Sequence, residues 1–396
     1  MTRFKYLIVG GGMTADSATK GIRSVDASGS IGMITVEPVP PYDRPPLSKG
    51  LWKGKSFGSI WRDTEGRGVD VVTDRKVVSL DPGKREVIDD QGATYRYERL
   101  LLATGGTPKR HSASGSIPIY YRTVDDYRRL RELADEKQRF IVVGGGFIGS
   151  EIAAALAING KNVTMAFFES GLCGRILPPE LTETLNSHYE KKGVRLFSGR
   201  GLAKMKTKGG EVEVRLEDGT VLTADAVIAG LGIAPNMELA AQAGLGVGNG
   251  ILVDECLRTS SVNIYAAGDV ASFPCRSLNQ RVRLEHEDNA NAMGELAGRN
   301  MAGHSESYHY LPYFYSDLFD IGYEAVGETD PSHRTVIEWV EPNMKGVVFY
   351  LEGDQVRGVL CWNLFGKLDA ARELITSHGS YRDGELKTWV KERLVP

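Results

Sequence analysis

The feature that most constrains the fold is a glycine-rich pattern that occurs twice. Residues 6–15 read YLIVGGGMTA and residues 140–149 read FIVVGGGFIG. In both segments a short apolar strand runs into a glycine turn, and small residues typical of a helix follow. This is the G-x-G-x-x-G/A pattern of a βαβ unit that binds a dinucleotide. Two copies predict two dinucleotides in one chain, a donor and an acceptor of hydride.

Each position of the repeated pattern has a physical role. The first glycine permits a tight turn, the second lets the backbone approach a pyrophosphate, and the third position packs the helix on the strand. The pyrophosphate lies on the helix N-terminus, where unpaired N–H groups and the helix dipole favour an anion. The cofactor-binding positions expected from the two copies are Gly10, Gly12, Ala15, Gly144, Gly146, Phe147, Ile148 and Gly149.

An acidic residue, Glu37, follows the second apolar run of the first copy, residues 31–36. A carboxylate at this place binds ribose hydroxyls. The alternative is a solvated charge at a strand end. Later strands at residues 97–103 and 226–230 also end at glycine, and we expect the chain to pass between two doubly wound domains there.

Beyond about residue 310 the pattern changes. Alternating strands at residues 335–340, 346–351 and 356–362 precede a helix at about residues 367–377. This mixture predicts an α+β unit instead of a further dinucleotide-binding half. The expected fold class is therefore α/β, with two doubly wound, Rossmann-like dinucleotide-binding domains and a C-terminal α+β domain.

Composition excludes several classes of protein. Glycine accounts for 47 of 396 residues, well above the usual ~7%, which favours tight turns and close backbone approaches to a ligand. Lys and Arg total 48 against 51 Asp and Glu, so no nucleic-acid partner is expected. No apolar run approaches the ~20 residues of a membrane span, and the N-terminus has no charged leader, so we expect a cytoplasmic protein. The four cysteines lack metal-binding spacing, so we expect no metal site and free thiols, with a disulfide as the alternative.

Several motifs occur together in the order of one family. They are the two glycine patterns, residues 42–49 (YDRPPLSK), residues 103–105 (ATG) and residues 265–269 (YAAGD). The chain resembles FAD-dependent, NAD(P)H-using reductases of the pyridine nucleotide-disulfide superfamily. The RPPLSK segment is similar to that of bacterial ferredoxin and rubredoxin reductases and of apoptosis-inducing-factor flavoproteins. The resemblance implies an FAD domain of residues 1–112 and 235–310, an NAD(P)H domain of residues 113–234, and a C-terminal domain of residues 311–396.

The resemblance also implies the reaction, hydride transfer from nicotinamide to flavin, for which the protein supplies geometry and charge. Arg44 and Lys49 are implied to lie near the flavin, with Glu151 as the counter-charge of Lys49, so Lys49 and Glu151 are the expected catalytic residues. The alternatives are a surface lysine and a carboxylate on a helix face. Asp269 is implied to bind ribityl hydroxyls, unless it is only a turn residue. Further positions implied to contact a cofactor are Val77, Ala103, Thr104, Gly105, Gly232, Gly268 and Glu285.

A helix is predicted at residues 287–298, with acidic residues in its first turn. The resemblance implies that its N-terminus points at the pyrimidine ring of the flavin and that His286 lies near the ring. The alternative for His286 is a structural role. Tyr315 stands where the family usually has a tryptophan and is implied to stack on flavin or nicotinamide. Tyr313 and Phe314 are either part of this site or core aromatics.

NADH is expected in preference to NADPH. The strand at residues 162–168 ends at Glu169, whose carboxylate would bind the adenine ribose and repel a 2′-phosphate. Two features complicate this prediction, since Phe167 could occupy the ribose-facing position and Arg175 lies close in sequence.

The loop at residues 38–49 holds no cysteine, so no thiolate relay to a disulfide substrate is expected. The resulting hypothesis is an FAD-dependent NAD(P)H oxidoreductase that passes electrons from NADH through the flavin to an acceptor such as ferredoxin or another small iron–sulfur protein. Two alternatives stay open, a redox-sensing flavoprotein similar to apoptosis-inducing factor and an NADH oxidase or quinone reductase. The protein is expected to be a monomer or a homodimer.

Overall fold

The computed structural model describes residues 1–394. Its internal contacts group the chain into two compact units. The first unit contains residues 1–44, 57–107 and 234–312, and the second contains residues 45–56, residues 108–233 and the chain from residue 313 onward. Within residues 1–394, no helix is both long enough and apolar enough to cross a membrane.

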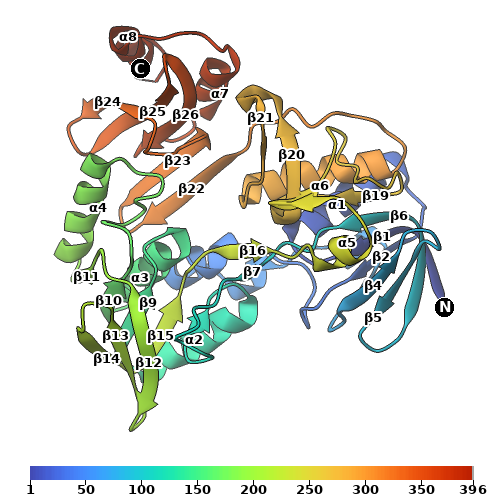
Figure 1. The fold of residues 1–396 in the computed structure, drawn as a ribbon, viewed down its shortest axis with the longest axis horizontal. Helices are drawn as coiled ribbons and strands as arrows, with labels where there is room; N and C mark the ends of the chain where they lie inside the picture. The colour runs from blue at the N-terminus through green and yellow to red at the C-terminus, as the bar shows by residue number, and fades with distance from the viewer. Residues whose placement is uncertain (395–396) are drawn as a thin grey trace. The chain divides into compact units, whose positions relative to one another are not determined.

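The first unit is built on a largely parallel sheet (Figure 1). Its elements are β1 (Thr2–Val9), α1 (Met13–Val25), β2 (Ile31–Ile34), β3 (Val69–Val72), β4 (Val77–Asp81), β5 (Glu86–Asp89), β6 (Thr94–Leu102), α5 (Glu238–Gln242), β17 (Val247–Gly248), β18 (Gly250–Leu252), β19 (Ile264–Ala266), β20 (Ala271–Cys275), β21 (Gln280–Val282) and α6 (Glu287–Met301). The main sheet has the order β3-β2-β1-β6-β5-β4, and β19 pairs with β6. The strands β3, β2, β1, β6 and β19 run parallel, whereas β4 and β5 pair antiparallel. A second sheet has the order β17-β18-β20-β21.

Two helices of this unit, α1 and α6, pack backbone against backbone. A Cβ atom added to Gly298 on α6 would lie 2.1 Å from the carbonyl oxygen of Ala18 on α1. One added to Gly294 would lie 2.4 Å from the carbonyl oxygen of Thr14, in the first turn of α1. Glycine is therefore what lets α6 lie directly on α1 and fixes the N-terminal turn of α1.

The second unit contains three sheets. Its elements are η1 (Pro45–Leu47), η2 (Gly50–Lys53), β8 (Ile119–Tyr120), α2 (Val124–Glu136), β9 (Arg139–Val143), α3 (Phe147–Ile158), β10 (Asn162–Ala166), α4 (Pro179–Lys191), β11 (Arg195–Phe197), β12 (Leu202–Lys208), β13 (Glu211–Leu216), β14 (Val221–Ala224), β15 (Ala226–Ala229), β22 (Tyr313–Leu318), β23 (Ile321–Gly327), β24 (Arg334–Glu341), β25 (Lys345–Glu352), β26 (Gln355–Trp362), α7 (Leu368–Thr376) and α8 (Asp383–Arg393). The sheet orders are β11-β10-β9-β15-β8, which is parallel, and β12-β13-β14 and β22-β23-β26-β25-β24, which are antiparallel. Short strands β7 (Gly106–Pro108) and β16 (Ile233–Pro235) pair with each other.

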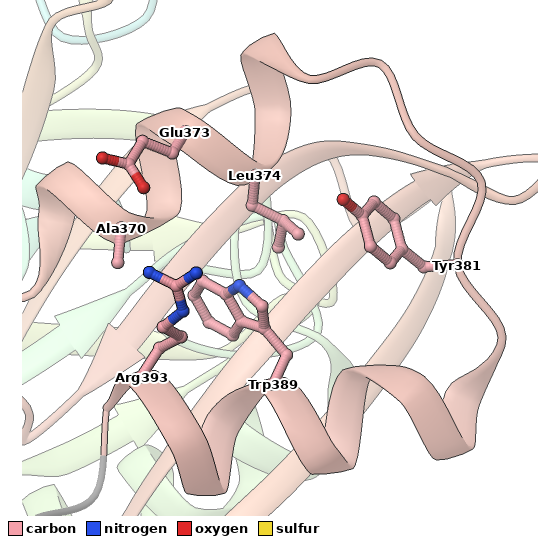
Figure 2. A pocket seen from close by; sticks show the side chains of 6 residues that line it. All are labelled: Ala370, Glu373, Leu374, Tyr381, Trp389 and Arg393. Atoms are coloured by element: carbon pink, nitrogen blue, oxygen red, sulfur yellow. The ribbon is translucent and has the colours of Figure 1, made fainter.

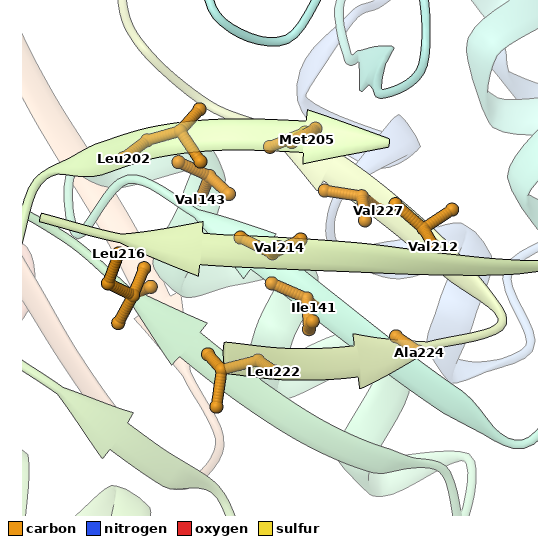
Figure 3. Packing of buried hydrophobic residues seen from close by; sticks show 11 residues of the cluster. Ile141, Val143, Leu202, Met205, Val212, Val214, Leu216, Leu222, Ala224 and Val227 are labelled. Atoms are coloured by element: carbon orange, nitrogen blue, oxygen red, sulfur yellow. The ribbon is translucent and has the colours of Figure 1, made fainter. Parts of the chain in front are cut away.

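The parallel sheet of this unit shares a core with the three-stranded sheet (Figure 3). Inward side chains of β9, β10 and β15 pack against β12, β13 and β14. Alternate residues of β13 and β14 point into this core, which is the period-two pattern of half-buried strands, whereas a register shift interrupts the pattern in β12. The buried cluster is Ile141, Val143, Ala166, Leu202, Met205, Val212, Val214, Leu216, Leu222, Ala224 and Val227. This core holds β9 in place, and the second glycine turn follows β9 directly.

The predicted α/β class is confirmed, since each glycine pattern joins a strand of a parallel sheet to a helix. The C-terminal strands and helix also lie close to the predicted positions, as β24, β25, β26 and α7. The predicted three-domain boundaries stay a prediction. The contacts place the C-terminal sheet in one unit with the second dinucleotide fold, together with residues 45–56.

Candidate functional site

The first glycine turn joins β1 to α1. Gly10 has a φ of +123°, and a Cβ atom added there would lie 2.1 Å from the carbonyl oxygen of Ala103, so only glycine fits. Gly12 is the N-cap of α1, and no side chain caps that helix end. A Cβ atom added to Gly12 would meet no atom within 4 Å, while Ala15 is buried in the first turns of the helix. The uncapped N–H groups and the open space beside them fit a pyrophosphate.

The second glycine turn, between β9 and α3, repeats this geometry. Gly144 has a φ of +106°, and an added Cβ atom would lie 2.3 Å from the carbonyl oxygen of Gly230. Gly146 is the N-cap of α3 without a side-chain cap, and it too faces open space. Gly149 packs on the carbonyl of Gly144, whereas Ile148 is exposed. This turn therefore also fits a pyrophosphate.

Glu37 lies in an ion pair with Arg44 in the first unit. The hydroxyl of Tyr42 donates to the other oxygen of the Glu37 carboxylate at 2.5 Å, and Arg44 Nη1 donates to the same hydroxyl at 3.0 Å. Glu37 is thus a partly buried, paired carboxylate and not the solvated charge of the alternative interpretation. Tyr42 belongs to this cluster although the sequence did not single it out.

Thr104 and Gly105 are tied to the end of β16. The Thr104 hydroxyl donates to the carbonyl of Asn236 at 2.7 Å, and the Asn236 amide donates back to the Thr104 carbonyl at 2.8 Å. The Asn236 N–H also donates to the carbonyl of Gly105 at 2.9 Å. Asn236 therefore holds the predicted ATG segment in shape.

Gly268 and Asp269 follow β19 and lie beside the first turn of α1. A Cβ atom added to Gly268 would lie 2.2 Å from Thr14 Oγ1, so glycine permits this approach. The carbonyl of Asp269 accepts from Arg283 Nη1 at 3.0 Å, and Arg283 forms an ion pair with Glu285 at 2.7 Å. The structure thus brings Gly268 and Asp269 to the first glycine turn and links Asp269 to Glu285 through Arg283.

His286 is the N-cap of α6, and no side chain caps this helix end. The pKa of His286 is lowered to about 4 because its surroundings remove it from water, while the charge of Asp269 acts in the opposite direction. His286 is therefore neutral at pH 7. A neutral imidazole adds no charge to the positive end of the α6 dipole.

Two predicted residues lie at the edges of these clusters. Val77 is the first residue of β4 and pairs with Asp89 on β5, so it belongs to the antiparallel extension of the sheet. Gly232 is exposed with a φ of +79°, and its carbonyl accepts from the N–H of Lys109 at 2.9 Å. Their predicted roles in cofactor binding stay predictions.

Lys49 and Glu151 form a buried ion pair in the second unit, with Lys49 Nζ 2.8 Å from Glu151 Oε1. The side chain of Lys49 is 13% exposed and that of Glu151 is 2% exposed. Glu151 also accepts from the hydroxyls of Ser48 at 2.5 Å and Ser316 at 2.7 Å. The two residues are therefore paired as predicted, and the alternative of a surface lysine does not describe this geometry.

Lys49 reaches Glu151 because residues 45–56 are anchored on the second unit. The carbonyl of Leu47 accepts from the Tyr121 hydroxyl at 2.6 Å and from Trp52 Nε1 at 2.8 Å. Asn159, the C-cap of α3, donates to the carbonyl of Trp52 at 3.1 Å. This segment therefore contacts both ends of α3, since Glu151 lies near the N-terminal end of the same helix.

Tyr315 lies beside Lys49, with Lys49 Nζ 5.1 Å from the centre of its ring, a distance suited to a cation–π interaction. Phe314 points to the opposite side of β22 and packs edge-on against Phe147 with ring centres 5.4 Å apart. Phe314 is buried and fits the core alternative, whereas Tyr313 and Tyr315 are only partly buried. The structure thus groups Tyr315 with Lys49 and Glu151.

Glu169 follows β10, and its carboxylate accepts from Arg175 Nε at 2.6 Å. Phe167 is buried and packs on the second glycine turn, since a Cβ atom added to Gly145 would lie 2.8 Å from the Phe167 ring. Arg175 is 80% exposed. The carboxylate predicted to bind the ribose is therefore paired with a long, exposed arginine side chain that counters its charge.

All four cysteines lie within the described residues and are free thiols, so the alternative of a disulfide is wrong for this structure. Cys173 and Cys361 are buried, and burial raises the pKa of these thiols to about 11 and about 12. Thiols with such pKa values are protonated at pH 7 and react slowly. Cys173 lies near the second glycine turn, since its N–H donates to the carbonyl of Gly145 at 2.7 Å.

A separate shallow cavity of about 220 Å³ opens between α7 and α8 (Figure 2). Its lining is Ala370, Glu373, Leu374, Tyr381, Trp389 and Arg393. The sequence analysis assigned no functional role to these residues. Within residues 1–394, none of them forms a hydrogen bond or ion pair with Lys49 or Glu151.

Comparisons with known proteins identify the family of this chain. The model of the pyridine nucleotide-disulphide oxidoreductase family matches residues 4–294. The model of the C-terminal part of mitochondrion-associated apoptosis-inducing factor matches residues 297–344 and 340–377.

Curated proteins and solved structures show similarity over almost the whole chain. Apoptosis-inducing factor 1, mitochondrial, of Dictyostelium discoideum is 33% identical over 425 residues, covering 96% of this chain and 80% of that protein. Putidaredoxin reductase of Pseudomonas putida is 31% identical over 384 residues, covering 93% and 91%. The crystal structure of a covalent putidaredoxin reductase–putidaredoxin complex has a TM-score of 0.91 at 28% identity and covers 99% of both chains.

Proposed function

Because the chain belongs to the pyridine nucleotide-disulphide oxidoreductase family, we propose that it passes electrons from NADH, through bound FAD, to a small redox protein. It is an FAD-dependent NAD(P)H oxidoreductase. Bound FAD supplies the chemistry of accepting a hydride from the nicotinamide and releasing electrons to an acceptor.

The observation that carries the proposal is the pair of uncapped helix N-termini. Both α1 and α3 begin at a glycine that faces open space, and neither has a side-chain cap. Unpaired N–H groups at a helix start bind anions, and a dinucleotide presents a pyrophosphate there. Two such sites in one chain suit an enzyme that holds two dinucleotides at once.

We assign FAD to the first unit on the residues gathered around α1. Gly10, Gly12 and Ala15 would hold the pyrophosphate, Glu37 the adenosine end, and Asp269 the ribityl hydroxyls. Because Arg44 pairs with Glu37, we assign it to the adenosine end and not to the flavin ring, where the resemblance implied it. The N-terminus of α6, which begins after His286, would stabilise negative charge on the flavin through the helix dipole. NADH is assigned to the turn before α3.

Lys49 and Glu151 are the residues to which we assign a catalytic role in reduction of the flavin. The carboxylate holds the ammonium group in one place, and the ring of Tyr315 borders it. A cation fixed before the reaction stabilises developing negative charge without reorganising during the step. This pre-organisation is the contribution that we expect from the protein.

Electrons are proposed to leave the flavin without passing through a thiol. The loop at residues 38–49 contains no cysteine. The thiols of Cys173 and Cys361 are buried and have raised pKa values, which makes them poor nucleophiles. A relay to a disulfide substrate is therefore not part of the proposal.

NADH is proposed as the preferred nucleotide. Glu169 lies at the end of β10, where its carboxylate would accept hydrogen bonds from the adenine ribose and repel a 2′-phosphate. The ion pair with Arg175 weakens that repulsion. We therefore expect a moderate preference and not an absolute one.

Steady-state turnover with several acceptors tests the proposed function. With NADH as donor, kcat/KM should be highest for a small iron–sulfur protein of the putidaredoxin type, above quinone and oxygen. Equal or higher kcat/KM with quinone or oxygen would contradict the proposed partner.

One alternative has an observation in its favour. The match to the C-terminal part of apoptosis-inducing factor suits a flavoprotein that reacts slowly with acceptors and serves as a redox sensor. Such a protein would be reduced by NADH but would turn over slowly with every acceptor in the same series.

A further inference from the structure

We propose that Ser48 and Ser316 are positioning residues that hold the Glu151 carboxylate in the orientation that pairs with Lys49. The inference rests on the proposed function, because it gives these hydroxyls a part in flavin reduction. Ser48 lies within the YDRPPLSK segment, but neither serine was assigned a role from the sequence.

The contacts around Glu151 occupy both of its carboxylate oxygens. Oε1 accepts from Lys49 Nζ at 2.8 Å and from Ser316 Oγ at 2.7 Å. Oε2 accepts from Ser48 Oγ at 2.5 Å. Both serines are buried, so water does not compete for these bonds. A carboxylate held at both oxygens cannot rotate without breaking at least one of them.

This restraint matters because the last torsion of a glutamate side chain is soft. Rotation about a terminal sp³–sp² bond has broad minima, so the ion pair alone leaves the plane of the carboxylate free to turn. The hydroxyls supply the missing restraint from two directions. Ser48 comes from residues 45–56, and Ser316 comes from β22.

Ser316 also couples the carboxylate to the ring beside Lys49. Ser316 pairs with Tyr323 in the β22–β23 ladder, which fixes its height along the strand. Its neighbour Tyr315 points to the other side of β22 and lies 5.1 Å from Lys49 Nζ. The strand β22 therefore positions both the Glu151 carboxylate, through Ser316, and the Tyr315 ring beside the Lys49 ammonium group.

A simpler role for the hydroxyls would be to satisfy a buried carboxylate, with no influence on Lys49. Buried charges need hydrogen bonds, and two serines would serve that purpose wherever Lys49 lay. The two roles differ in one respect. Only positioning predicts that removing a hydroxyl changes the behaviour of the lysine itself.

The first measurement follows Lys49 in the FAD-loaded protein without NADH. Acetylation of Lys49 by a small amine-reactive reagent, quantified by peptide mass spectrometry, should be about tenfold faster in Ser316→Ala and in Ser48→Ala than in wild type, because a hydrogen bond to a charged group is lost. Ser114→Ala is the matched control, since Ser114 is another buried serine of the same unit, bonded to His111 and Tyr120. It should leave the rate of Lys49 acetylation unchanged.

The second measurement separates binding from chemistry by stopped-flow reduction of the flavin. Ser316→Ala should lower the limiting rate constant at saturating NADH about tenfold and leave the NADH Kd unchanged, because misplaced groups lose rate before they lose affinity. In a Lys49→Met background the same serine substitution should change the rate constant less than about twofold, since residues that act as a unit are not additive.

Two results would overturn the proposal. One is Lys49 acetylation at the wild-type rate in both serine variants, and the other is an equal effect of Ser316→Ala with and without Lys49. If Ser316→Ala does not fold, both the acetylation and the stopped-flow measurement are made on Ser48→Ala, with the same expected results. The acetylation assay needs neither NADH nor an acceptor, so failure of the proposed function in turnover assays would leave its outcome intact and the two failures are distinguishable.

Discussion

Glu151 is almost inaccessible to water, so its charge depends on partners within the protein. Lys49 is the only cation among the described hydrogen bonds and ion pairs of this carboxylate within residues 1–394, and the other donors are hydroxyls. We therefore expect loss of Lys49 to affect both the proposed reaction and the stability of the fold. This differs from a surface ion pair, whose loss costs little.

We expect Lys49→Met to slow reduction of the flavin by NADH at least about tenfold, because the fixed cation is lost. The free energy of unfolding should fall by about 3 kcal/mol, because a buried charge loses its partner. Stopped-flow reduction and urea unfolding of the FAD-loaded protein measure the two effects. The double variant Lys49→Met/Glu151→Gln should regain part of the stability and none of the rate. Wild-type reduction rates in Lys49→Met would remove the role assigned to the lysine.

His286 predicts a pH dependence of stability. The pKa of His286 is about 4 in the folded protein, and an unfolded histidine titrates near 6.5. Between these values the unfolded chain binds the extra proton, so the contribution is present above pH 6.5 and is lost as the pH falls towards 4. The loss is at most about 3 kcal/mol. Urea unfolding of wild type and His286→Gln over this range should show a steeper fall for wild type, and parallel curves would contradict the prediction.

Glu169 and Arg175 predict opposite changes in nucleotide preference. Glu169→Gln removes the charge that repels a 2′-phosphate, so kcat/KM for NADPH relative to NADH should rise about tenfold. Arg175→Gln removes the cation that counters this charge, so the same ratio should fall. The two variants control each other because they break one ion pair from its two ends. An unchanged ratio in both would show that this pair does not contact the nucleotide.

At the scale of secondary-structure elements, the packing of α6 on α1 gives a direct test. A Cβ atom at Gly298 would lie 2.1 Å from the carbonyl oxygen of Ala18 and 2.8 Å from the backbone nitrogen of Ile22. Gly298→Ala should lower the free energy of unfolding by about 2 kcal/mol, because rigid backbone has to move. It should also weaken retention of FAD, since α1 begins at the first glycine turn.

Gly384 provides the matched control. It lies in α8, and a Cβ atom added there would meet nothing within 4 Å. Gly384→Ala should therefore keep FAD binding and change stability by less than about 1 kcal/mol, in the stabilising direction expected for alanine in a helix. Equal effects of the two substitutions on the free energy of unfolding and on FAD retention would contradict the role assigned to the packing of α6 on α1.

Local patterns explain which elements could be predicted from the sequence. A glycine turn between an apolar strand and a small-residue helix is a local signal, and both copies appear in the structure at the predicted residues. The helix predicted at residues 287–298 is α6, which continues to Met301. In its last turn, Gly298, Asn300 and Met301 are buried. Element type follows from short-range pattern, whereas ends depend on tertiary contacts.

Contacts between distant segments explain what the sequence could not predict. Ser48 and Ser316 lie in segments that the resemblance covers, but nothing in those segments indicates that both hydroxyls bind Glu151. They do so because residues 45–56 and β22 both reach this carboxylate. The role of Asn236 could not be predicted for the same reason, since its hydrogen bonds to Thr104 join residues far apart in the chain. The pairing of Lys49 with Glu151 could be expected only from a resemblance, because composition and periodicity contain no such signal.

At the scale of the whole molecule, we propose two nucleotide sites in one chain and a flavin that delivers electrons without a thiol relay. Both proposed sites have the same local structure, a helix (α1 or α3) whose N-cap is a glycine and makes no side-chain capping hydrogen bond. The family match spans the segments of both glycine turns, and the relatives cover nearly the whole chain. The net charge of −3 is small, so we expect docking of a small redox protein to depend on local charges and not on the overall field of the protein.

Anaerobic titration of the FAD-loaded protein with NADH, followed by addition of an oxidised small iron–sulfur protein, tests the central claim most directly. The account predicts that NADH bleaches the flavin absorbance and that the iron–sulfur protein restores it, with all accessible thiols blocked beforehand. A folded, FAD-containing protein whose flavin stays oxidised with excess NADH, or whose electrons reach the acceptor only when its thiols are free, would contradict it.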